Sequence, residues 1–247
     1  MSGHSKWATT KRKKAKIDQA RAKVFTRIIR ELTVSARMGG SDPDANPRLR
    51  AAVLKAKGAN MPAKNIEQAI AKGAGELEGQ SFSEITYEGY GPAGTAIIIA
   101  SMTDNRVRTV AELRNIFSKN GGNLGEEGSV AWMFKDMGII TLPKSAIAED
   151  KLFELVTENG AEDLLTEGDD YEIRVPPAAY NGLLEALHQQ KLTPSNSELA
   201  KLAENRIMVT GEDAAKVVKL LDMLDDHDDL QNVWTNADFD SEELENL

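Results

Sequence analysis

GIITLPKSAIAEDKLFELVTENGAEDLLTEGDDYEIRV, residues 138–175, is the stretch of sequence that decides the fold. Its apolar start predicts a strand over 138–142, and Ser145 begins a helix whose apolar residues recur at helical spacing until an Asn-Gly pair ends it. Segments 163–166 and 171–175 flank a polar turn and predict a hairpin. The stretch therefore predicts the order β-α-β-β.

The residues that follow complete this unit. Pro176-Pro177 opens a further helix, and residues 195–202 predict a further strand. The resulting order, β-α-β-β-α-β, is that of a ferredoxin-like domain, which we place at residues 138–205.

The segments on either side of this unit predict a second α/β domain. Strands are expected over 85–90, 95–101 and 129–134, with a helix after Asn105. Beyond the unit, Thr210–Asp213 is a helix-capping signature preceded by a strand at 207–209 and followed by one at 230–235. We expect these parts, 79–137 and 206–247, to form one domain into which the ferredoxin-like unit is inserted.

The first 78 residues predict a helical domain with a basic N-terminal arm of about 20 residues. An apolar stripe runs from Val24 until Gly39-Gly40, Asn46-Pro47 begins a second helix, and Pro62 begins a third. The expected fold class is therefore α+β, with an N-terminal helical bundle and two α/β domains, the third domain being inserted into the second.

Charge is divided unevenly along the 247 residues. The net charge is −9, which taken alone argues against a nucleic-acid partner. Residues 1–75 nevertheless hold 17 Lys+Arg and 5 Asp+Glu, a balance of +12, whereas residues 76–247 have a balance of −21. The acidic part already supplies solubility, so the basic part favours binding to a polyphosphate.

The predicted nucleic-acid contacts come from the arm and the helices after it. Basic side chains neutralise phosphates, and Trp7 suits stacking on a base or wedging into a groove. The candidate residues are Lys6, Trp7, Lys11, Arg12, Lys13, Lys14, Arg21, Lys23, Arg27, Arg30, Arg48 and Arg50. Composition does not separate DNA from RNA.

Three other features of the sequence are candidates for binding phosphate, a cation or nucleic acid. The Gly-rich segment 121–128 follows a predicted helix and carries two Glu, so we interpret it as a loop rather than a phosphate cradle. The acidic run 225–229 lacks the spacing of a calcium loop and is expected to be a solvated helix end. Arg106, Arg108 and Arg114 either extend the nucleic-acid surface or pair with Asp104 and Glu112.

Several functional classes are not expected. Cysteine is absent and only three His occur, at 4, 188 and 227, so we predict no metal site, no cofactor and no catalytic site. No apolar run has the ~20 residues of a membrane span, and no signal peptide is recognisable. The absence of cysteine fits a reducing cytoplasm.

Seven motifs are spread along the chain, namely Gly3–Trp7, Phe25–Leu32, Asp42–Arg50, Tyr87–Pro92, Asp104–Arg106, Arg108-Thr109 and Gly121–Gly125. In their residues and in their order they resemble the YebC/PmpR family, and the resemblance spans the whole chain. The family commonly has Asn where this chain has Thr9.

This resemblance implies three domains, an N-terminal helical bundle and two ferredoxin-like α/β domains, together with a cytoplasmic location and no enzymatic activity. It implies a DNA-binding transcriptional regulator, with a ribosome-associated translation factor that binds RNA as the alternative, since other members activate translation. The acidic domains are expected to face away from the nucleic acid or to bind protein partners. Lys6, Arg27, Arg30, Arg48 and Arg50 lie within the family motifs and are the preferred binding residues.

Overall fold

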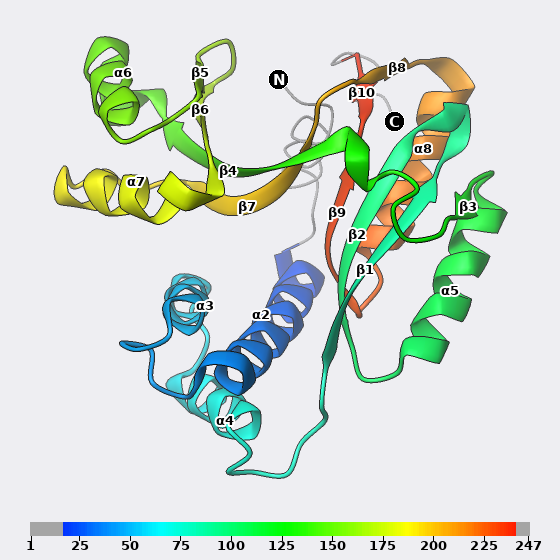
Figure 1. The fold of residues 1–247 in the computed structure, drawn as a ribbon, viewed down its shortest axis with the longest axis horizontal. Coiled ribbons are helices and arrows are strands. Elements are labelled where there is room, and N and C mark those ends of the chain that lie inside the picture. Colours follow the sequence, from blue (N-terminus) through cyan, green and yellow to red (C-terminus); the bar gives the residue numbers. More distant parts are fainter. Residues whose placement is uncertain (1–16, 241–247) are drawn as a thin grey trace.

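The computed structural model describes residues 17–240, and it describes side chains from residue 22 onward. Three helices come first, namely α2 (Ile17–Gly39), α3 (Pro47–Gly58) and α4 (Ala63–Gly73), and they pack together as one group (Figure 1). Leu32 and Leu49 are fully buried between them. Gly73 allows α2 and α4 to approach closely, because a Cβ there would lie 2.2 Å from the carbonyl oxygen of Thr33. The predicted helical bundle is confirmed.

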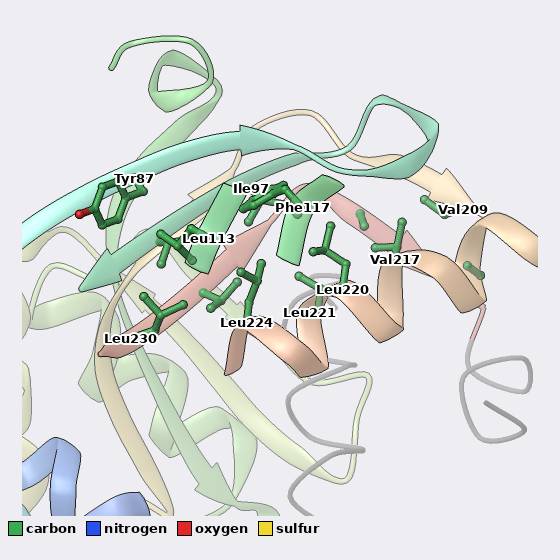
Figure 2. Close-up of a cluster of buried hydrophobic side chains, with 14 of the residues drawn as sticks. Tyr87, Ile97, Leu113, Phe117, Val209, Val217, Leu220, Leu221, Leu224 and Leu230 are labelled. Atoms are coloured by element: carbon green, nitrogen blue, oxygen red, sulfur yellow. The ribbon is translucent and has the colours of Figure 1, made fainter. Parts of the chain in front are cut away.

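The next elements build an antiparallel sheet with strand order β3-β1-β2-β9. Its elements are β1 (Ser83–Tyr90), β2 (Ala96–Thr103), α5 (Arg106–Lys119), β3 (Asn123–Leu124), α8 (Gly211–Asp225) and β9 (Leu230–Thr235). Helices α5 and α8 cover one face, where Leu113 and Phe117 of α5 meet Leu220 and Leu224 of α8 over Ile97 (Figure 2). Strand β9 pairs with β2, although about half of the chain lies between the two strands in the sequence.

A second antiparallel sheet has strand order β5-β6-β4-β7. It consists of β4 (Phe134–Pro143), α6 (Glu149–Glu158), β5 (Asp163–Leu165), β6 (Asp170–Val175), α7 (Pro177–Gln189) and β7 (Asn196–Ala203). The first strand of this unit lies between the third and the fourth, as in a ferredoxin-like sheet. Both the predicted element order and the mixed α+β class are confirmed, whereas the proposed domain boundaries stay a prediction.

The two sheets share an apolar junction. Ile98 and Trp234 point from the first sheet into a cluster with Val130 and Ala200, so the face opposite α5 and α8 is covered by the start of β4 and by β7. The strand expected at 207–209 is β8 (Ile207–Val209), which pairs in parallel with β10 (Ala237–Phe239) as a separate pair. No helix among residues 17–240 combines the length and apolarity needed to cross a membrane.

Two local predictions are wrong. The strand expected over 129–134 is a 3-10 turn, η2 (Ala131–Met133), because backbone N–H groups of Val130 and Ala131 donate to the buried carboxylate of Glu88 instead of to a neighbouring strand. The helix expected from Ser145 is preceded by a 3-10 turn, η3 (Lys144–Ala146), and begins only at Glu149. The Gly-rich segment ends α5 and leads through β3 into a loop, as predicted.

Candidate nucleic-acid interface

The exposed cations of the helical group lie on α3, at both ends of α4, where Lys64 and Lys72 are found, and at the end of α2, where Arg37 is found. Asn46 caps α3 by accepting a hydrogen bond from the backbone N–H of Leu49, at 3.1 Å. The small buried stripe of α3, which is Leu49, Ala52 and Ala56, faces α2 and α4. The cations of α3 therefore lie on its other sides.

This surface carries cations without nearby acids in the sequence. Arg50, Lys55, Lys57 and Lys64 are exposed, and none of them forms an ion pair with another residue in the described part of the chain. No Asp or Glu occurs between residues 45 and 66. We call these four residues the α3–α4 cationic surface.

The cations of α2 have a different environment. The Lys23 ammonium lies 3.2 Å from an Asp225 carboxylate oxygen and 3.0 Å from one of Asp226. Arg27 donates to the Asp225 carboxylate at 2.9 Å and to the backbone carbonyls of Asp225 and Leu230 at 2.8 and 2.9 Å. Both side chains therefore hold α2 against the C-terminal end of α8.

Arg30 completes this attachment at a buried carboxylate. Its guanidinium lies 3.0 Å from Asp229, donates to the carbonyls of Met102 and Asp228, and lies over the ring of Phe82. Asp229 is 2% exposed. The prediction of a solvated helix end is therefore wrong for Asp225 and Asp229, which receive the cations of α2, whereas Asp226 and Asp228 are exposed. We call the contacts of Lys23, Arg27 and Arg30 with residues 225–230 the α2 clamp.

Asp229 is stabilised as a charged group. Arg108 and Thr109 donate to its carboxylate at 2.8 and 2.7 Å, and Thr103 donates at 3.1 Å. Burial acts to raise the pKa of Asp229, but the hydrogen bonds from Arg108 and Thr109 and the charges of Arg30 and Arg108 outweigh it, so the pKa lies below its ordinary value. Asp229 is therefore ionised at neutral pH.

Three side chains around this carboxylate, with Asp229 among them, have the spacing of metal ligands. One ligand atom each of Glu112, His227 and Asp229 lie within 4.8 Å of one another. His227 is already engaged, because its Nε2 lies 2.8 Å from Glu112 and its Nδ1 accepts from the Asp229 backbone N–H. Arg30 and Arg108 both contact the Asp229 carboxylate and would repel a cation.

The remaining described candidates separate into paired and free side chains. Arg48 lies 2.7 Å from a carboxylate oxygen of Glu31 and also binds Glu84, and the hydrogen bonds that it donates to Glu84 and Glu31 raise the pKa of its guanidinium. Arg50 has only a 3.5 Å contact with the carbonyl of Asp44. Of the predicted residues with described side chains, Arg50 alone lies on the α3–α4 cationic surface.

The other predicted residues cannot be placed. Lys6, Trp7, Lys11, Arg12, Lys13 and Lys14 lie outside the described residues, and the same holds for the side chain of Arg21. Three residues of the α3–α4 cationic surface, Lys55, Lys57 and Lys64, were not predicted. The sequence signal that would have found them is the absence of acids over 45–66.

The arginines of α5 divide into one paired side chain and two exposed ones. Arg108 pairs with Asp104 at 2.9 Å and with Asp229. Arg106 and Arg114 are exposed and form no ion pair within residues 22–240, and Glu112 instead contacts His227. The α5 cluster is therefore partly structural.

Fold and surface together define the class of protein. It has a mixed α+β fold with two antiparallel sheets, and its cation-bearing helices are fixed to the first of these sheets. The chain belongs to the TACO1/YebC family. The family's N-terminal domain matches residues 5–76, and its second and third domain match residues 82–237. The resemblance identified in the motifs is confirmed.

Similar proteins cover the chain from end to end. A probable transcriptional regulatory protein of Koribacter versatilis is 52% identical over 247 residues, which is 100% of this chain and 99% of the relative. One from Geobacter sulfurreducens is 50% identical, with 100% of both chains covered. The crystal structure of a conserved hypothetical protein from Aquifex aeolicus has a TM-score of 0.84 at 42% identity, covering 92% of this chain and 94% of that one.

Proposed function

We propose that the chain is a transcriptional regulator that binds DNA through the N-terminal arm and the α3–α4 cationic surface. The observation that carries this proposal is the set of exposed cations, Arg50, Lys55, Lys57 and Lys64, without carboxylate partners in the described part of the chain. Free ammonium and guanidinium groups release counterions from a polyphosphate, whereas groups already paired with carboxylates contribute less. The names of the relatives from Koribacter and Geobacter support a regulatory role.

The α2 clamp narrows the proposed contact surface. Lys23, Arg27 and Arg30 would have to leave Asp225 and Asp229 before they could bind phosphate. We therefore assign them to fixing the helices on the first sheet. The nucleic acid is expected to approach α3 and α4, away from the acidic end of α8.

The experiment is a salt titration of duplex DNA binding by fluorescence anisotropy with the full chain. The test variant is K55Q/K57Q/K64Q, and the matched control K151Q/K191Q/K219Q also removes three exposed lysines, from the acidic part of the chain. Each lost phosphate contact reduces the steepness of the plot of log binding constant against log salt concentration by about 0.9, so the slope of the test variant should be shallower by roughly 2.7. The control should keep its slope.

Equal slopes for the wild type and the test variant would refute the proposed surface. The same titration with ribosomal RNA fragments separates the two polyanions. A preference for RNA at equal salt would leave the surface in place and replace DNA as its ligand.

A further inference from the structure

The loop between β3 and β4 presents an aromatic side chain to solvent. Trp132, in the turn η2, is 69% exposed, whereas Trp234 is 6% exposed in the junction between the sheets. Trp132 is also the most exposed aromatic residue among those that the structure describes. A tryptophan exposed to this extent forgoes the stabilisation that burial provides and leaves its aromatic face available to a partner.

Hydrogen bonds to Glu88 hold the loop that carries Trp132 in one conformation. The buried carboxylate of Glu88 accepts hydrogen bonds from the backbone N–H groups of Gly128, Val130 and Ala131 at 2.7, 2.7 and 2.8 Å, and the Glu88 carbonyl accepts one from the Gly125 N–H at 2.8 Å. Gly128 has a φ of +84°, which suits glycine.

Hydrogen bonds also keep Glu88 ionised and hold the indole of Trp132 in place. Burial acts to raise the pKa of Glu88, but the three backbone hydrogen bonds outweigh it and the pKa is lowered. The Ser129 carbonyl accepts from the Tyr90 hydroxyl at 2.8 Å and from Trp132 Nε1 at 3.1 Å. The aromatic ring is therefore positioned in advance of any contact, which lowers the entropy cost of binding.

Three exposed glutamates lie near the ring, whereas the nearby cations Lys135 and Lys201 are paired with Glu162 and Asp136. Glu126 and Glu127 are exposed on the same loop, and the backbone N–H of Glu204 donates to the carbonyl of Met133 at 3.0 Å, which places Glu204 beside η2. None of these three glutamates forms an ion pair with another residue in the described range. Their charges would repel a nucleic acid and attract a cation.

We propose that Trp132 with Glu126, Glu127 and Glu204 forms a docking surface for an arginine- or lysine-rich segment of a partner protein. The carboxylates supply charge complementarity, and the indole face supplies a cation–π contact, which is strongest for tryptophan. Guanidinium groups also stack on aromatic faces, so an arginine-rich segment fits better than a lysine-rich one. This surface is distinct from the α3–α4 cationic surface and does not depend on the proposed function.

The test uses a fluorescently labelled nona-arginine peptide as the probe and measures its anisotropy with the full chain. We expect W132A to raise Kd about fivefold, because the cation–π contact is lost, and W132F to retain most of the affinity. E126Q/E127Q/E204Q should raise Kd and flatten its salt dependence. Circular dichroism checks that each variant keeps its fold.

The chain offers matched controls at another exposed aromatic. Phe153 is 58% exposed, and Glu154, Glu158 and Glu185 are exposed residues of α6 and α7. F153A and E154Q/E158Q/E185Q should bind the peptide like the wild type. Equal weakening by test and control variants would show only diffuse attraction to an acidic protein and would overturn the proposal, as would an unchanged Kd for W132A.

Discussion

Asp229→Asn tests whether the α2 clamp holds the helices to the first sheet. The carboxylate is 2% exposed and contacts Arg30 at 3.0 Å, Arg108 at 2.8 Å and Thr109 at 2.7 Å. A hydrogen bond to a charged group contributes about 1.5–3 kcal/mol when buried. The Arg30 side chain is 12% exposed, so the full value applies to its interaction with Asp229. The Arg108 side chain is 42% exposed, so its interaction with Asp229 contributes at most about 1 kcal/mol.

Asparagine keeps one acceptor oxygen for Thr109, so we expect Asp229→Asn to lower the free energy of unfolding by about 2–4 kcal/mol. The measurement is urea unfolding at pH 7, followed by circular dichroism. Asp228→Asn is the matched control, because the Asp228 side chain lies one residue away and is exposed, and its change should stay within about 0.5 kcal/mol. A double-mutant cycle with Arg30→Gln should give a coupling energy of about 1–2 kcal/mol.

The pH dependence has a definite sign. The pKa of Asp229 is lowered in the folded state, so its stabilisation is complete above the unfolded value of about 3.9 and is lost as pH falls through the folded pKa. The stability difference between wild type and Asp229→Asn should therefore be constant from pH 7 to about 5 and shrink below about pH 3.9. If Asp229→Asn unfolds at the same urea concentration as Asp228→Asn at pH 7, the clamp contributes no stability and Arg30 is available for a ligand.

Further predictions concern buried contacts of the fold. Glu88→Gln should lower the free energy of unfolding in urea by about 2–3 kcal/mol, because the amide NH2 of glutamine would face the Gly128 N–H in place of an accepting carboxylate oxygen. Hydrogen exchange at the Gly128 amide should become faster. Arg27→Gln should lower the unfolding free energy by about 1–3 kcal/mol and leave the DNA salt slope unchanged, because its partners lie within the protein. Gly73→Ala should lower the melting temperature, since its Cβ would meet the backbone of Thr33 and separate α2 from α4.

The element order could be predicted because most signals are local. Apolar spacing within 138–205 and the turn residues between its segments were enough for the ferredoxin-like order, and the sheet order β5-β6-β4-β7 agrees with it. The strand expected over 129–134 failed for a non-local reason. Glu88, about 40 residues earlier in the chain, takes the backbone donors that a strand there would have used.

The binding region was harder to predict than the fold. Charge along the sequence indicates which part of the chain is basic, but it does not show which cations are already paired. Lys23 and Arg27 meet carboxylates about 200 residues later in the chain, and only the tertiary structure brings them together. Unpaired lysines such as Lys55 attract less notice in the sequence, because they stand outside the motifs that carry the family resemblance.

The clamp also changes what the charge division means. A balance of +12 over residues 1–75 suggests a uniformly basic domain that contacts the polyanion, with the acidic part of the chain facing away from it. The structure instead places the acidic run 225–229 directly against α2, so this side of the helical group is close to neutral. Among the described residues of the helical group, the unpaired cations then lie mainly on α3 and α4, and this is where the proposed ligand is expected to approach. Net charge thus indicates that a polyanion is acceptable, and the pairing of individual cations indicates where it can bind.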